Sequence, residues 1–335
     1  MTKWYPLGRA MILGAGLAMA AHGAFAETVI KLAHDNVPDH PMGKGFTFFK
    51  EYIEEQSGGE FRVDIFDSSK FGNFDSVVQG LQSGLLQMGS SSTPNLSPFS
   101  KDFLIFDMPY LFPSYEAADL ITDGPVGQKA AQALAATGII GLGYIDIGFR
   151  HIFNNQRVVE NVSDAAGLKI RSTPSKVHIA TLNSFGANPT PIGWSEVYTA
   201  LQQKTVDGID IDLNLAWFNN FHEVNKNLTL TGSTYSPHLV MVSQMFMESQ
   251  SPEHQALIRE GVEKMKIFER DLIRSNEKEI IEKMRDAGVN VVELTPEQLE
   301  EWKAVTAPIY DEFEEAVGKD LIEQVRQTIA DHTAK

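Results

Sequence analysis

The sequence predicts a two-domain α/β protein, and three features lead to this prediction. Residues 28–34 and 61–66 alternate in polarity like β-strands, and they flank an amphipathic helical pattern over 43–56. Connections this short join the three segments into a parallel βαβ unit. The chain is also longer than one ordinary domain, and residues 252–286 form a helical pattern long enough to bridge two domains.

The first 26 residues have the pattern of a secretory signal peptide. Lys3 and Arg9 precede an apolar run from Ala10 to Ala21, and Ala24-Phe25-Ala26 forms an Ala-x-Ala cleavage site. The run is too short, and too rich in alanine and glycine, to be typical of a membrane span, although a retained anchor is an alternative. We expect a mature chain of about 309 residues.

The composition excludes several classes of function. The net charge of −16 becomes −18 without Lys3 and Arg9, so the mature chain is a poor candidate for binding nucleic acid or an anionic membrane. Apolar residues make up 43% of the chain, which is enough for sizeable cores. The chain has no cysteine, which excludes disulfides, thiolate metal sites and thiol catalysis. An exported, acidic, cysteine-free protein fits a bacterial periplasm.

Further elements follow in order along the chain. Helical patterns cover 74–84, 128–137, 175–185 and 195–204, and strand patterns cover 86–90, 139–146, 168–171, 206–213, 229–234, 239–246 and 289–294. Residues 186–191 have the glycine and prolines of a turn, and Thr295-Pro296-Glu297 starts a final helical region. Residues 103–112 form a dense aromatic run that we interpret as core packing, with a ligand groove as the alternative.

Two arginines that follow predicted strands make the strongest functional signal. Arg171 ends the strand over 168–171 and precedes Ser172-Thr173-Pro174, a helix-start signal, and Arg150 comes shortly after the strand over 139–146. A guanidinium beside helix-start amides is suited to bind a carboxylate. An arginine in a surface ion pair is the alternative, but two strand-end arginines are less easily explained that way in so acidic a chain. Ligands of open α/β sheets bind beyond the carboxyl ends of the strands, so we expect an anion site there.

No sequence motif for hydrolysis, phosphate binding or redox chemistry is present. The histidines are scattered without the spacing of metal ligands. Asp207, Asp210 and Asp212 lack the glycine and the terminal glutamate of a calcium loop. In the strand over 206–213, alternation places Ile209, Ile211 and Leu213 on one face and Asp210 and Asp212 on the other. We therefore expect no catalytic residue, no metal site and no cofactor.

The order and spacing of several motifs resemble the dicarboxylate-type substrate-binding proteins of tripartite ATP-independent periplasmic (TRAP) transporters. The matching segments run along nearly the whole mature chain and are 34–43, Phe71-Gly72, 106–112, Gly148-Phe149-Arg150, 168–171, 186–189, 196–202 and 206–208. The resemblance implies a two-domain periplasmic binding-protein fold with an interdomain cleft, hinge strands and a long domain-spanning helix. It implies domain I over 27–147 and 236–276, and domain II over 148–235 and 277–335.

The resemblance also assigns roles to residues of the cleft. It implies that Arg171 clamps the carboxylate of a small organic acid, that Arg150 is a second arginine in the cleft, and that Trp194 lies against the ligand. Loops of domain I that resemble the family's cleft-lining loops contain His34, Asn73, Asp75 and Ser92, and Phe149 is an aromatic residue near the arginines.

One position departs from the family pattern. Where the family usually has an asparagine that contacts the ligand, this chain has Ile211, which removes a polar contact. Acidic groups, Asp210 among them, lie close by in the sequence. We therefore expect a monocarboxylate whose far end is apolar, hydroxylated or cationic. Asp210 either accepts hydrogen bonds from this ligand or has a structural role.

The resemblance further implies a mechanism and partners. A ligand that contacts both domains would shift an equilibrium between open and closed forms, and the closed form would deliver the ligand to the membrane subunits of a TRAP transporter. We expect the protein to be a monomer. Three alternatives stay open: an exported lyase or isomerase acting on a small carboxylic acid, a binding protein of an ATP-driven importer, and a sensory or scaffold protein that binds its ligand without transport.

Overall fold

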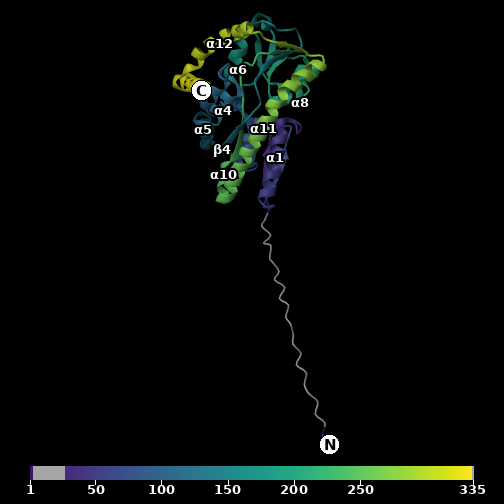
Figure 1. The fold of residues 1–335 in the computed structure, drawn as a ribbon, viewed down its shortest axis with the longest axis vertical. Coiled ribbons are helices and arrows are strands. Elements are labelled where there is room, and N and C mark those ends of the chain that lie inside the picture. Colours follow the sequence, from purple (N-terminus) through teal and green to yellow (C-terminus); the bar gives the residue numbers. More distant parts are fainter. Residues whose placement is uncertain (3–26, 334–335) are drawn as a thin grey trace.

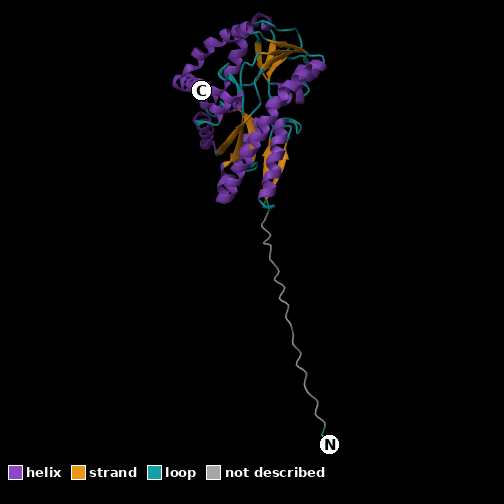
Figure 2. Cartoon of the chain, in the orientation of Figure 1, coloured by secondary structure: helices purple, strands orange, loops and turns teal. Residues whose placement is uncertain are grey.

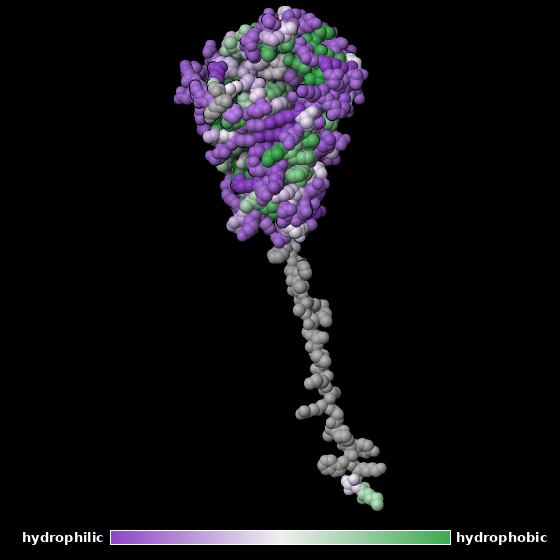
Figure 3. Space-filling view, in the orientation of Figure 1, coloured by the Kyte–Doolittle hydropathy of each residue, from purple (hydrophilic) through white to green (hydrophobic). Residues whose placement is uncertain are grey.

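The computed structural model describes residues 1–2 and 27–333, and its strands form two separate sheets (Figures 1 and 2). The expected signal peptide lies, apart from its first two residues, outside the described residues. Among the helices that are described, none has the length and apolar character needed to cross a membrane. The face of the folded part shown in Figure 3 is largely hydrophilic, with hydrophobic residues gathered in small separate areas.

Domain I is built on a five-stranded sheet with the strand order β2-β1-β3-β10-β4. Its strands are β1 (Thr28–Ala33), β2 (Phe61–Phe66), β3 (Met88–Ser92), β4 (Ile139–Ile145) and β10 (His238–Ser243). Strands β1, β2 and β3 are parallel, whereas β10 runs antiparallel to both β3 and β4. The first residue of β10 therefore lies at the same sheet edge as the carboxyl ends of β1 and β3.

Several helices belong to domain I. They are α1 (Pro41–Gln56), α2 (Phe74–Ser83), α3 (Thr93–Leu96), η1 (Lys101–Asp107), α4 (Tyr115–Thr122), α5 (Pro125–Gln132), η2 (Ala133–Thr137) and α10 (Gln244–Ser249). Local sequence explains where two of them begin. His40 accepts a hydrogen bond from the backbone of Met42 at the start of α1, and Asn73 caps α2 by accepting from the backbone of Ser76.

Domain II is built on a six-stranded sheet with the strand order β11-β9-β5-β8-β6-β7. Its strands are β5 (His151–Asn154), β6 (Lys169–Ser172), β7 (Asn188–Pro191), β8 (Gly208–Ile211), β9 (Asn227–Leu230) and β11 (Asn290–Glu293). Its helices are η3 (Val162–Ala165), α6 (Lys176–Ser184), η4 (Trp194–Glu196), α7 (Val197–Gln202), α8 (Leu213–Phe218) and α9 (Phe221–Val224).

The two sheets are joined by paired chain crossings and by one long helix. The crossing from β4 to β5 and the crossing from β9 to β10 run side by side, because Arg150 donates its backbone N–H to Thr234 and accepts one from Ser233. Helix α11 (Pro252–Asp286) extends along both sheets. It begins near α10 and runs as far as α8 (Figure 1). The expected helix over 252–286 is confirmed at both ends. The predicted two-domain α/β fold with hinge strands and a bridging helix is also confirmed.

Within the described residues, four apolar cores fill the space between sheets and helices. Two of them involve the sheet of domain I: α1 and α11 close one, and α2, α4, α5 and η1 close the other. Two further cores lie in domain II. The aromatic run over 103–112 supplies buried core residues, which confirms the packing interpretation; they are Phe103, Ile105, Phe106, Met108, Leu111 and Phe112.

The last two helices pack against both parts of the molecule. Trp302 of α12 (Pro296–Val317) is buried in a core of domain II, while Ile309 and Phe313, farther along the same helix, join a core of domain I. Helix α13 (Lys319–Thr333) also packs on that core of domain I. The expected boundaries place all of 277–335 with domain II, whereas the end of α12 and all of α13 pack against domain I.

Some local expectations differ from the structure. Residues 188–191, expected as part of a turn, form the edge strand β7, which pairs with β6. The strand expected over 206–213 ends at Ile211, because Asp212 caps α8 by accepting a hydrogen bond from the backbone of Leu215. The helix expected over 128–137 begins earlier and changes to a 3-10 helix at Ala133.

Candidate functional site

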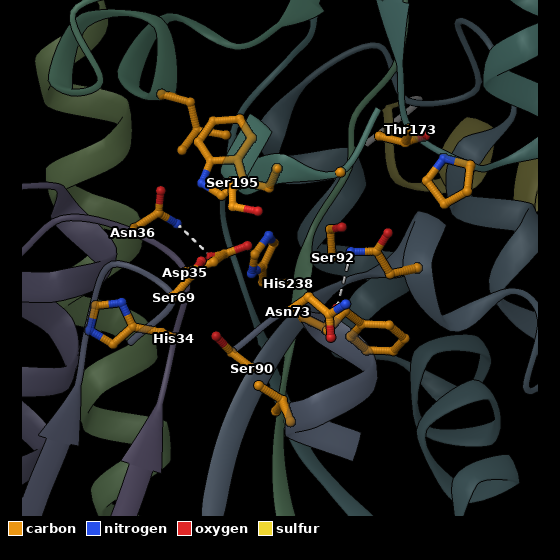
Figure 4. Close-up of a pocket in the computed structure, with 18 of the residues that line it drawn as sticks. His34, Asp35, Asn36, Ser69, Asn73, Ser90, Ser92, Thr173, Ser195 and His238 are labelled. Carbon is orange, nitrogen blue, oxygen red and sulfur yellow. Dashed lines mark hydrogen bonds between the residues drawn. The ribbon is translucent and has the colours of Figure 1, made fainter. Parts of the chain in front are cut away.

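A cavity of about 480 Å³ lies between the two domains, and both domains line it (Figure 4). Domain I contributes the ends of β1, β3 and β10 together with the loops that follow β1 and β2. Its polar lining residues are His34, Asp35, Asn36, Ser69, Asn73, Asp75, Ser90, Ser91, Ser92, Asn95 and His238. Domain II and the crossing before it contribute both polar and apolar residues. The polar ones are Arg150, Arg171, Thr173, Ser195 and Glu196, and the apolar ones include Ile192, Trp194, Ile211 and Leu215.

Arg171 lies on β6 and is buried, with 5% of its surface exposed. Its Nε and Nη2 both donate to the backbone oxygen of Ile192, at 3.0 and 2.9 Å. Among the residues that the structure describes, none accepts a hydrogen bond from Nη1. Burial, with a contribution from Arg150, lowers the pKa of Arg171 to about 9, so the side chain stays charged at neutral pH. One edge of the guanidinium is thus fixed to the protein, and the Nη1–Nη2 edge is left for a ligand.

Arg150 lies at the crossing into domain II and is paired with Asp210 of β8. Its Nε donates to Oδ2 of Asp210 at 2.6 Å, and its Nη2 donates to the backbone oxygen of the same residue. Both side chains are buried. The aspartate therefore balances the charge of this arginine inside the protein. Asp210 itself is not among the residues that line the cavity.

An apolar surface flanks Arg171. The guanidinium carbon of Arg171 lies 5.9 Å from the centre of the Trp194 ring, within the range of a cation–π contact. The Trp194 ring packs edge-on against Phe221, which holds it in place. Ile211 and Leu215 are buried and line the same cavity. This wall offers an apolar surface to the body of a ligand whose anionic group is at Arg171.

The facing wall of domain I carries two buried histidines. Burial lowers the pKa of His34 to about 4 and that of His238 to about 3, so both rings are neutral at pH 7. Neither ring nitrogen of His34 has a hydrogen-bond partner within the described part of the chain, and the same is true of Nδ1 of His238. Buried polar atoms normally find partners, so these nitrogens point to a ligand or to water.

Asp35 and Asn36 follow His34 at the end of β1. Asn36 donates from its side-chain amide to Oδ1 of Asp35 at 3.1 Å, and the structure describes no donor to the side-chain oxygen of Asn36. Burial raises the pKa of Asp35 to about 6, while Arg171 acts to lower it. Asp35 is one of the residues that line the cavity (Figure 4). At neutral pH this part of the wall presents a carboxylate and an amide oxygen, both of which accept hydrogen bonds.

The cavity brings together all the residues expected from the sequence except Asp210 and Phe149. The ring of Phe149 packs instead between Tyr115 and Tyr235 at the hinge. Asn73 has a structural task as the cap of α2, and both Asn73 and Asp75 are exposed at the rim. Among the described residues, no group of acidic or histidine side chains has the geometry to hold a metal ion.

Sequence reasoning missed several lining residues, with His238 and Asp35 as the most prominent. His238 reaches the cavity because β10 is antiparallel to its neighbours, and a single strand pattern does not reveal its direction. Thr173 was seen only as part of a helix-start signal. Its hydroxyl lies 2.9 Å from Nδ1 of the buried His178, and the residue lines the cavity.

Comparisons with known proteins agree with this geometry. The model of the family described as bacterial extracellular solute-binding protein, family 7 (DctP), matches residues 32–316. The C4-dicarboxylate-binding periplasmic protein DctP of Rhodobacter capsulatus is 33% identical over 321 residues, which cover 94% of this chain and 95% of that protein.

Two solved structures are also similar. The sugar acid binding protein DctPAm from Advenella mimigardefordensis, in complex with galactonate, gives a TM-score of 0.88 at 28% identity, with 91% of this chain and 98% of that chain covered. A TRAP periplasmic solute-binding protein from Polaromonas sp. JS666, bound to D-erythronate, gives a TM-score of 0.86 at 32% identity, with 90% and 98% covered.

Proposed function

Because the chain belongs to the family of bacterial extracellular solute-binding proteins, family 7, we propose that it captures a small organic acid through Arg171 and delivers it to the membrane subunits of a TRAP transporter. The chain is a solute-binding protein of the TRAP type and not an enzyme, since the family and the relatives named above are binding proteins. The alternatives of an exported lyase and of a binding protein for an ATP-driven importer are therefore set aside.

The observation that carries the proposal is the state of Arg171. The side chain is buried at the cavity, one edge of its guanidinium is fixed by Ile192, and the structure describes no acceptor for Nη1. A buried cation needs a partner, and a carboxylate matches the geometry of the free edge with two parallel hydrogen bonds. The R. capsulatus, A. mimigardefordensis and Polaromonas relatives are each named with a carboxylic acid ligand, which supports the same ligand class.

Closure of the two domains supplies the affinity that one arginine lacks. A micromolar dissociation constant corresponds to about −8 kcal/mol, whereas a hydrogen bond to a charged group contributes only about 1.5–3 kcal/mol. Both domains line the cavity, so a ligand that fills it contacts both and favours the closed form. Closure also expels water from around Arg171 and Trp194, which strengthens the ion pair. The hinge crossings and α11 provide the connection about which the domains move.

The place of action and the oligomeric state belong to the same proposal. Export through the segment 1–26 brings the chain to the periplasm, where the relative from R. capsulatus is also named as periplasmic. The cavity is lined by residues of a single chain, so one copy is sufficient to bind a ligand. We therefore propose a periplasmic monomer that shuttles between its ligand and the transporter.

The proposal is tested by a thermal-shift screen of the purified protein against small carboxylic acids, followed by calorimetry on each hit. A ligand at 100 times its dissociation constant stabilises the protein by about 2.7 kcal/mol, a shift of a few degrees. Arg171→Ala should abolish the shift, and Arg171→Lys should weaken binding although the charge is kept, because the planar fork is lost. Arg62→Ala, at an exposed arginine of domain I, is the matched control. A shift that survives in Arg171→Ala would exclude the carboxylate clamp.

A further inference from the structure

The two walls of the cavity differ in charge. Domain II and the crossing before it contribute Arg150 and Arg171, and Asp210 balances the first of these. The described lining residues of domain I include no lysine and no arginine. Its histidines are neutral, as shown above, because they are buried. A ligand with one carboxylate on Arg171 therefore meets a far wall that has no positive charge for a second carboxylate.

The far wall is instead rich in hydrogen-bonding groups that carry no positive charge. A neutral imidazole has one nitrogen that donates and one that accepts, and the ring of His238 lines this wall. Nδ1 of His238 and the side-chain oxygen of Asn36 are buried without a described partner. The hydroxyls of Ser90 and Ser92 line the same wall. Hydroxyl groups of a ligand, which both donate and accept, match this mixture.

Asp35 makes the wall selective as well as polar. Asp35 lines the cavity, where its carboxylate accepts hydrogen bonds and repels a second anionic group (Figure 4). Burial of an unpaired like charge is costly because few water molecules screen it. A long aliphatic tail is also disfavoured, since it would leave these buried polar atoms without partners.

We propose that the natural ligand is a polyhydroxylated monocarboxylate, a sugar acid, whose carboxylate binds Arg171 and whose hydroxyl groups bind His238 and Asp35. This inference rests on the proposed function, because it takes Arg171 as the carboxylate site. It adds that domain I selects against dicarboxylates. The wall of domain II holds the charged end of the ligand, and the wall of domain I recognises the hydroxylated end.

The test compares acids that differ in one property at a time. Calorimetry is run with aldonates of four and six carbons and with a hexuronate. The comparison acids are the matching hydroxylated dicarboxylates (tartrate, glucarate), the plain acids butyrate and hexanoate, the dicarboxylates succinate and adipate, and norleucine. We expect the tightest ligand to be an aldonate or a hexuronate, at least tenfold tighter than its dicarboxylate and unhydroxylated counterparts. A dicarboxylate, a plain acid or norleucine that binds as tightly would overturn the inference.

The variants separate this inference from the proposed function. His238→Leu should weaken binding of the tightest sugar acid at least tenfold. Asp35→Asn should reduce the ratio between the affinities for this sugar acid and for its matching dicarboxylate at least threefold. Asp39→Asn, at an exposed aspartate outside the cavity, is the control for charge, and thermal unfolding of each ligand-free variant checks that it folds. If Arg171→Ala abolishes binding but the dicarboxylate is preferred, only the inference fails. If no acid binds, or Arg171→Ala has no effect, the proposed function fails with it.

Discussion

Nε of Arg150 lies 2.6 Å from Oδ2 of Asp210, and both side chains are almost completely buried. The pair connects the crossing between the domains to strand β8 of domain II. A second hydrogen bond, from Nη2 of Arg150 to the backbone of Asp210, adds to the ion pair. Such pairs offset their desolvation only when good hydrogen bonds accompany them. Here Nε and Nη2 of Arg150 both bind Asp210, whereas Oδ1 of Asp210 is buried without a described partner. The consequence for function is that Arg171 is the arginine whose charge is left for the ligand.

Removal of Asp210 should therefore destabilise the protein strongly. Asp210→Ala leaves the guanidinium of Arg150 buried without its partner, which costs about 3–5 kcal/mol of unfolding free energy. Urea denaturation measures this loss. As a control, Glu279→Ala removes an exposed ion pair with Lys283 on α11 and should leave the stability nearly unchanged. Equal stability of the two variants would contradict the structural role given to Asp210.

His151 should make stability depend on pH. It is buried at the start of β5, and its Nδ1 accepts a hydrogen bond from the backbone of Gly232 at 3.0 Å. Burial, and to a lesser degree Arg150, lowers the pKa of His151 to about 3. Below the unfolded pKa of about 6.5, the unfolded chain binds a proton here and the folded chain does not, so the unfolding free energy falls as the pH falls towards about 3.

The effect of His151 is measured by urea denaturation at pH 7 and at pH 5. This histidine alone should remove up to about 2 kcal/mol of unfolding free energy at pH 5. His151→Gln should show a smaller difference in stability between the two pH values than wild type, whatever its stability at pH 7. His332→Gln, at an exposed histidine of α13, should keep the wild-type difference. An unchanged difference in His151→Gln would show that this ring is not held neutral by the fold.

Gly148 should tolerate no side chain at the hinge. Its φ of 117° lies in the region that favours glycine, and a Cβ at this position would lie 3.1 Å from the hydroxyl of Tyr115 and 3.4 Å from Cβ of Asp212. Gly148→Ala should cost about 1–3 kcal/mol of unfolding free energy, measured by urea denaturation. Gly138→Ala is the matched control, because Gly138 has a φ of 78° with open space around it. Equal losses would mean that strain alone, without crowding at the hinge, explains the effect.

The sequence was informative where a pattern is local. Pro252–Asp286 shows a helical pattern throughout, and the helix has the predicted bounds because a proline after a serine cap begins it. Arg171 could be placed at the anion site because a strand and a helix start flank it. Residues 188–191 were missed as a strand, since two prolines in a short segment are typical of a turn and are tolerated here at a sheet edge.

Other features depend on contacts between distant segments and could not be predicted. The pairing of Arg150 with Asp210 needs β5 and β8 side by side, and the strand patterns alone do not give that order. His238 reaches the cavity only because β10 enters the sheet antiparallel to β3, from the side of the cleft. The charge difference between the walls follows from both arrangements, and so it became visible only in the folded chain.

A contact outside the cavity should control how readily the domains close. Phe218, at the end of α8 in domain II, lies with its ring centre 5.7 Å from that of His40 and 5.8 Å from Nζ of Lys44, both on the α1 side of domain I. Phe218 is not among the residues that line the cavity, so its contacts do not need a ligand. Opening of the cleft separates these surfaces. The contact therefore favours the closed form even when no ligand is bound.

Phe218→Ala should weaken ligand binding without removing any group that touches the ligand. Loss of a cation–π contact and an aromatic contact lowers the stability of the closed form by about 1 kcal/mol. If the open and closed forms of the free protein are about equally populated, the apparent dissociation constant rises about threefold because fewer molecules are closed. Calorimetry measures the affinity, and small-angle scattering of the free protein should show a larger radius of gyration. Phe268→Ala is the control, because Phe268 stacks on Phe48 within domain I and should change neither quantity. If Phe218→Ala keeps the wild-type affinity and scattering curve, closure does not depend on this contact, and the ligand alone holds the domains together.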